Sequence, residues 1–155
     1  MMKRKNLLQL LSLLMSVGLT FLISSCMFSV RLSDGSVRMA SVSDQEIMRF
    51  MNRMGTLTER LLEETRNHGE DGLARVVTEM RMICNDMARQ MGQNPATPVD
   101  VDKLELKVKA FDLQMSNRFK SAPGAPGIKS IETLFQQLQS EVNRFKTLVE
   151  RSVWH

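Results

Sequence analysis

The sequence contains no tyrosine, one tryptophan and two histidines in 155 residues, and aromatic residues make up only 5% of it. It also lacks the His-Glu-x-x-His motif of zinc proteases and a glycine-rich phosphate loop after a strand. Acid-base catalysis needs titratable groups in a desolvated cleft. The carboxylates here lie mostly among lysines and arginines, which is typical of solvated helix surfaces. The sequence therefore predicts a protein that is not an enzyme.

Cysteine is also scarce, and Cys26 lies just after a long apolar stretch that runs from Leu7 to Ile23. That stretch follows the positive segment Met1-Met2-Lys3-Arg4-Lys5. A charged segment, an apolar run and small residues, in this order, are typical of a secretory signal peptide. The run is near the shortest length that spans a bilayer, so an uncleaved membrane anchor is the alternative.

The four residues Ile23-Ser24-Ser25-Cys26 resemble the bacterial lipobox, an aliphatic residue and two small residues before a cysteine that receives diacylglycerol. The resemblance implies that residues 1–25 are a lipoprotein signal peptide, cleaved before Cys26. Each buried methylene of an acyl chain contributes about 0.8 kcal/mol to membrane binding, so more than one chain gives a durable anchor. The lipobox resemblance also implies that the protein is located in the bacterial cell envelope. Because Met27 replaces the aspartate that favours inner-membrane retention, we expect the outer membrane, facing the periplasm.

Removal of residues 1–25 changes the charge balance of the chain. The whole sequence has 21 Lys and Arg against 17 Asp and Glu, and three of the basic residues lie in the signal, so the mature chain has 18 against 17. Nucleic-acid binding needs a basic surface, so we expect no nucleic-acid partner. Only Cys84 then remains as a free thiol, and no intrachain disulfide can form.

Residues 26–42 are predicted to be the lipidated cysteine and a flexible tether, since they are rich in serine, include Asp34-Gly35 and show no sustained apolar period. Residues 43–155 are predicted to be a four-helix bundle domain. Ser43 and Glu46 form a capping box at the start of the first helix. The proline- and glycine-rich residues 121–127 separate the third helix from the fourth, which Ser130 is expected to cap.

Apolar residues in these four helices recur at alternating steps of three and four, which predicts narrow stripes facing a common core. Short connections favour antiparallel neighbours. The predicted fold is all-α, an antiparallel up-down-up-down four-helix bundle after a signal peptide and a short tether. The predicted core consists of Ile47, Phe50, Met51, Met54, Leu57, Thr58, Leu61, Leu73, Val77, Met80, Cys84, Met87, Met91, Leu104, Val108, Phe111, Met115, Phe119, Ile131, Leu134, Leu138, Val142, Phe145, Leu148 or Val149, and Val153.

Two stretches resemble the first hairpin of cytochrome b562, a small periplasmic four-helix haem protein: "MGTLTERLLEE" from Met54 and "VTEMRMICNDMARQMGQNPATP" from Val77. The resemblance implies that Met54 is an axial haem ligand and that haem b is bound noncovalently. The family's second ligand is a histidine near the end of the last helix, where this sequence has Lys146. The histidines His68 and His155 lie elsewhere, so we expect the scaffold without the haem.

Methionine is abundant, and Met48, Met51 and Met54 lie within two turns of one predicted helix, with Met87 and Met91 on another. Thioethers suit Cu(I), but methionine at core positions more often fills irregular space between helices. We therefore expect core packing, with no metal and no cofactor.

Three hypotheses of function remain. The first is a lipid-anchored, haem-free helical bundle that acts as a binding or structural module, with the membrane as partner through Cys26 and an envelope protein as a further partner. The second is a periplasmic electron carrier that binds haem b through Met54. The third is a copper-binding envelope protein that uses the methionine stripe.

Overall fold

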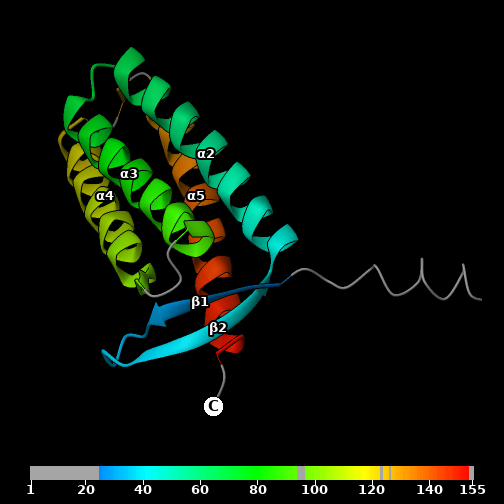
Figure 1. The fold of residues 1–155 in the computed structure, drawn as a ribbon. Helices are drawn as coiled ribbons and strands as arrows, with labels where there is room; N and C mark the ends of the chain where they lie inside the picture. Colours follow the sequence, from blue (N-terminus) through cyan, green and yellow to red (C-terminus); the bar gives the residue numbers. More distant parts are fainter. Residues whose placement is uncertain (1–24, 94–96, 123, 126, 154–155) are drawn as a thin grey trace, which may run out of the picture.

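The structure, a computed structural model, describes residues 25–93, 97–122, 124–125 and 127–153. Apart from Ser25, the predicted signal peptide lies outside these residues, as does His155. Four helices make up most of the described chain, as predicted, but three strands also form a small sheet, so the all-α prediction is wrong in this respect (Figure 1). The elements are β1 (Ser25–Arg31), β2 (Val37–Ser43), α2 (Asp44–Asn67), α3 (Asp71–Gln93), β3 (Val99–Asp100), α4 (Val101–Ser121) and α5 (Ile128–Arg151).

The segment predicted to be a flexible tether is a β-hairpin, so that prediction is wrong. Strands β1 and β2 pair antiparallel from Ser25↔Ser43 to Arg31↔Val37. At the turn, Gly35 has a φ of +82°, which suits a residue without a Cβ, and the Asp34 carboxylate accepts hydrogen bonds from the Ser36 hydroxyl and amide. These bonds lower the pKa of Asp34. The hairpin is stabilised by the pairing of β1 with β2 and by the burial of one of its faces in the core.

The sheet lies across one end of the helices (Figure 1). Its order is β2-β1-β3, with β3 parallel to β1 and directly followed by α4. Ala40 of β2 forms a bridge with Val153, just after α5. The start of α2 follows β2, and the Cys26 side chain contacts the Met91 carbonyl near the end of α3. One end of each helix therefore adjoins the sheet.

Local signals explain most helix boundaries. Ser43 is the N-cap of α2, as predicted, and its hydroxyl accepts a hydrogen bond from the Glu46 amide while donating to the Glu46 carboxylate. The predicted cap at Ser130 is wrong, because α5 already begins at Ile128. Gly127, in the left-handed region with a φ of +79°, precedes it, and the earlier start places Ile128 against the helices.

The core confirms the predicted apolar stripes. All the predicted stripe residues are buried except Met51, Phe119 and Leu148, which are partly buried. Of the two alternatives Leu148 and Val149, Val149 is therefore the core residue. Each helix contacts the helices before and after it, and α5 also contacts α2. The hairpin adds four buried apolar side chains that were not predicted to lie in the core: Phe28, Val30, Ala40 and Val42.

Candidate functional site

Cys26 is the second residue of β1, where it pairs with Val42. Its side chain is half-buried, and the thiol donates to the Met91 carbonyl oxygen at 3.0 Å. Burial raises the pKa of Cys26, and the nearby Asp44 carboxylate acts in the same direction. The thiol is therefore neutral at physiological pH, which argues against a role as an unassisted nucleophile. A thioether at this sulfur would lose the bond to Met91, since it has no proton to donate.

Cys84 is a second free thiol and lies in the core on α3. Burial raises its pKa to about 12. A thiol in such surroundings is inert toward oxidants and metals, because the reactive form is the thiolate. Cys84 therefore behaves as a small apolar core residue.

Met54, the residue that the cytochrome resemblance implies as a haem ligand, is fully buried on α2. Its carbonyl oxygen accepts a hydrogen bond from the Thr58 hydroxyl at 2.7 Å. His68, the only histidine among the described residues, is the C-cap of α2, fourteen residues further on, and fourteen residues span about 21 Å of helix. His68 therefore cannot share an iron with Met54.

Lys146, the residue that the cytochrome resemblance implies at the level of the second haem ligand, directs its ammonium toward α4. It donates to the Asp102 carboxylate at 3.2 Å and to the Glu105 carboxylate. The bond to Glu105 raises the pKa of Lys146 despite partial burial, and Asp102 adds to the shift. An amine binds iron only when deprotonated, so this environment does not fit a haem ligand.

The methionines proposed as copper ligands do not form one accessible group. Met54, Met87 and Met91 belong to the core, whereas the Met48 side chain is 62% exposed. Among the residues that the structure describes, no cluster of three or more histidine, cysteine, aspartate or glutamate side chains could hold a metal ion.

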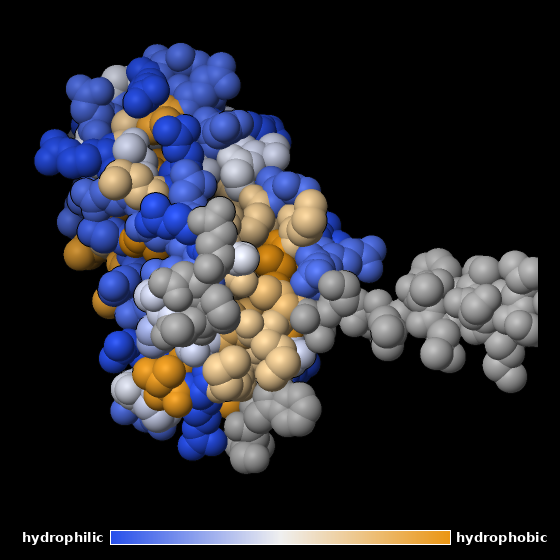
Figure 2. Space-filling view, viewed as in Figure 1, coloured by the Kyte–Doolittle hydropathy of each residue, from blue (hydrophilic) through white to orange (hydrophobic). Residues whose placement is uncertain are grey.

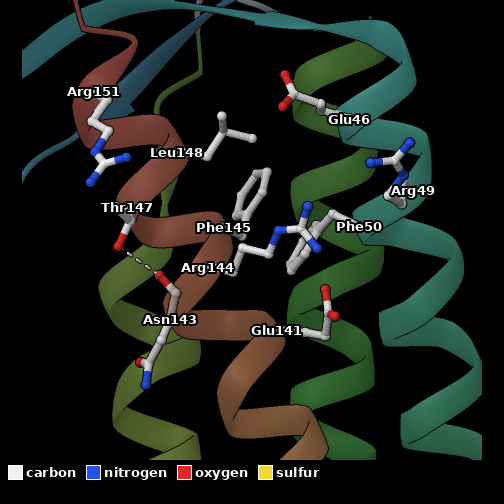
Figure 3. A pocket seen from close by; sticks show the side chains of 10 residues that line it. All are labelled: Glu46, Arg49, Phe50, Glu141, Asn143, Arg144, Phe145, Thr147, Leu148 and Arg151. Atoms are coloured by element: carbon white, nitrogen blue, oxygen red, sulfur yellow. Dashed lines mark hydrogen bonds between the residues drawn. The ribbon is translucent and has the colours of Figure 1, made fainter.

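A groove of about 390 Å³ lies between α2 and α5, near the sheet (Figure 3). Its floor is formed by the stacked rings of Phe50 and Phe145, whose centroids are 3.8 Å apart. Arg144 extends from α5 toward α2 over this floor, and Arg49 lies on the opposite wall. A third arginine, Arg151, also lines the groove, and none of the three guanidinium groups forms an ion pair with a described residue. With the carboxylates of Glu46 and Glu141, the groove therefore combines apolar surface with charges of both signs.

An ion pair crosses the interface between the same two helices. Arg53 of α2 donates to the Glu141 carboxylate of α5, and Glu141 lines both this groove and a second hollow of about 720 Å³ further along. The second hollow is lined mainly by uncharged polar side chains, including Thr133, Gln136 and Gln137. Neither hollow could be predicted from the sequence, because a groove depends on how two helices are rotated toward each other.

No protein family model, no characterised protein and no solved structure matches this chain. The cytochrome b562 resemblance therefore stays a hypothesis. No helix in the described part of the chain is long and apolar enough to cross a membrane.

Proposed function

We propose that this protein is a bacterial lipoprotein, anchored in the cell envelope through diacylglycerol on Cys26, whose helical domain acts as a binding or structural module and holds no haem. The observation that carries the proposal is the position of Cys26. It follows the apolar run and the small residues Ser24-Ser25, and it is also the second residue of the first strand. Cleavage before Cys26 would therefore remove only Ser25 from β1 and leave the pairs from Cys26↔Val42 to Arg31↔Val37 in place.

The proposal places the helices in an up-down-up-down arrangement. Support comes from the sheet, which adjoins the start of α2, the end of α3, the start of α4 and the end of α5. Neighbouring helices that alternate their near ends in this way run antiparallel. The anchor and the sheet then share one end of the domain, and the far ends of the helices extend away from the membrane.

The binding role rests on the groove between α2 and α5. Its apolar floor of Phe50 and Phe145 and the cations Arg49 and Arg144 suit an anionic ligand or a partner segment with an apolar part. We therefore propose binding or support of an assembly for this groove.

The anchor is tested by replacing Cys26 with Ser in cells. Wild-type protein should incorporate labelled palmitate, and globomycin, which inhibits the lipoprotein signal peptidase, should cause its precursor to accumulate. The Cys26→Ser variant should remain unlabelled, whereas the matched Cys84→Ser control should be labelled as in the wild type. Equal labelling of the Cys26→Ser variant would overturn the proposal. Membrane fractionation then tests the outer membrane against the inner membrane.

The haem-free state is tested by the absorbance spectrum of purified protein with added haemin. We expect no low-spin Soret band, and we expect Lys146→His to add none, because the side chain at this position faces the α4 carboxylates. A stoichiometric low-spin band that disappears in Met54→Ala would establish the electron-carrier hypothesis instead.

A further inference from the structure

The outer face of the β1–β2 hairpin carries three exposed apolar side chains beside its polar ones. Phe28 and Val30 point into the core, and the alternating residues Met27, Val37 and Met39 on the other face are 52%, 50% and 40% exposed. An antiparallel sheet with one solvated face normally carries polar side chains there. Figure 2 shows apolar surface gathered over the hairpin in the lower part of the view.

The register makes these three side chains part of one surface. Met27 and Ser29 are neighbours on one face of β1. Met39 of β2 lies opposite Ser29, and Val37 of β2 lies opposite Arg31. The Ser29 hydroxyl contacts the Met39 sulfur at 3.5 Å, and Ser29 is itself buried. Met39 therefore covers part of the Ser29 side chain, and the same face also carries Ser41, opposite Met27, and Arg31, opposite Val37.

This face begins one residue after the proposed lipid attachment. A strand rises about 3.3 Å per residue, so the whole of β1 lies within about 20 Å of Cys26. The paired strands leave no tether that could lift the sheet away from the bilayer. An uncleaved apolar run from Leu7 to Ile23 would bring the membrane to the same end of β1.

We propose that the outer face of the hairpin, formed by Met27, Val37 and Met39, rests on the lipid bilayer and fixes the orientation of the domain at the membrane. This inference depends on the proposed membrane anchor and goes beyond it, since an anchor alone leaves the domain free to tumble. Apolar side chains of amphipathic surfaces enter the boundary between headgroups and acyl chains by about 5 to 10 Å. The exposed Arg31 at the end of β1 can keep its guanidinium among the headgroups.

Lipid suits this surface better than a second protein does. Stable protein interfaces bury roughly 800 Å² on each partner, and three half-exposed side chains offer far less. A bilayer needs no complementary shape. The Cys26 side chain lies on the core face of β1, opposite Val42, but Cys26 directly precedes Met27, so the anchor still brings lipid close to this end of the hairpin. The three side chains Met27, Val37 and Met39 are therefore enough to orient the domain, although they would not hold it on a membrane without the anchor.

The test uses the full-length protein, purified from membranes and reconstituted in phosphatidylethanolamine and phosphatidylglycerol vesicles. An NBD fluorophore is attached at Met39→Cys or, as a matched control, at Leu113→Cys. Leu113 is 64% exposed on α4, and lies twelve residues from the start of that helix, about 18 Å from the sheet end. Met27 is left unchanged because the residue after a lipidated cysteine also affects sorting.

Flotation of the vesicles measures the anchor, and quenching by doxyl lipids measures contact of the face with lipid. We expect floated protein in which NBD at position 39 is blue-shifted and quenched several-fold more than at position 113, most strongly by a doxyl group close to the headgroup. Floated protein with equal, weak quenching at both positions would overturn the orientation and leave the anchor in place. A blue shift at position 39 without doxyl quenching would identify a protein contact and also overturn it. Protein that does not float would overturn both proposals.

Discussion

The His68 imidazole lies directly over Gly127, although the two residues are on different loops of the domain. A Cβ placed on Gly127 would come within 2.0 Å of the His68 ring, and the Gly127 backbone has a φ of +79°. The Glu64 carboxylate lies 3.4 Å from the histidine Nε2. This contact joins the turn between α2 and α3 to the start of α5.

We expect Gly127→Ala to destabilise the protein by more than the strain of a left-handed residue alone. That strain costs about 1 to 2 kcal/mol, and the His68 ring must also move away from Glu64 to make room. Urea unfolding measures the difference in free energy of unfolding.

Gly69→Ala is the matched control, because Gly69 has a φ of +68° and no atom near the site of a Cβ. It should show the backbone strain alone. In a His68→Ala background, the cost of Gly127→Ala should fall to that of Gly69→Ala. Equal costs in the wild-type background would mean that the imidazole moves aside freely.

Met80→Asp should abolish cooperative unfolding, because Met80 is fully buried and a carboxylate there would have no partner. Met82→Asp makes the same substitution two residues along α3, where the side chain is 61% exposed. It should change stability by no more than about 0.5 kcal/mol. Thermal melts followed by circular dichroism distinguish the two, and similar effects would show that α3 is rotated from the orientation described.

The folded protein should protect Cys84 from thiol reagents, and its stability should decline at high pH. Burial raises the pKa of this thiol from an ordinary value of 9.0 to about 12. Between these values the unfolded chain loses the proton and the folded chain keeps it, so ionisation stabilises the unfolded state. The free energy of unfolding of the wild type, relative to that of Cys84→Ala, should therefore fall as pH rises from about 9 to about 12. A relative stability that does not change across this range would show an accessible thiol, as would rapid reaction with a maleimide in native buffer.

The helices were predictable because their apolar stripes recur at the helical period, and burial of the stripes confirms this at nearly every position. The hairpin was missed because methionine stands on its outer face, so Met27-Phe28-Ser29-Val30 does not alternate cleanly between apolar and polar residues. The turn signal at Asp34-Gly35 was present but was attributed to a flexible linker. An Asp-Gly pair between two runs with β-branched and aromatic residues is itself evidence for a hairpin.

Partners on other helices could not be predicted from spacing. The cytochrome resemblance implies that Lys146 lies near the level of Met54, but the rotation of α5 decides which helix the ammonium approaches. The structure turns it toward Asp102 and Glu105 of α4. The groove over Phe50 depends on rotation in the same way. Because the hairpin was not predicted, the position of Cys26 in a strand was not predicted either.

Glu105→Gln should lower stability at neutral pH and leave it unchanged in acid. Hydrogen bonds from Lys109 and Lys146 lower the pKa of Glu105 from its ordinary value of 4.5. A carboxyl whose pKa is lower in the folded state stabilises the fold above its unfolded pKa, and this contribution is lost as pH falls through the folded value. The side chains are partly exposed, so the loss at pH 7 should be below about 1 kcal/mol.

Asp112→Asn is the control for this prediction, because Asp112 is exposed on the same helix and forms no ion pair with a described residue. Its stability should match that of the wild type at every pH. Denaturant unfolding at neutral pH and again well below pH 4.5 gives the comparison. The gap between Glu105→Gln and the wild type should close in acid, because protonation of the wild-type carboxyl removes the charge that the substitution removes at every pH. A gap of constant size would instead assign the loss to packing, and it would mean that Lys146 does not depend on Glu105 for its orientation toward α4.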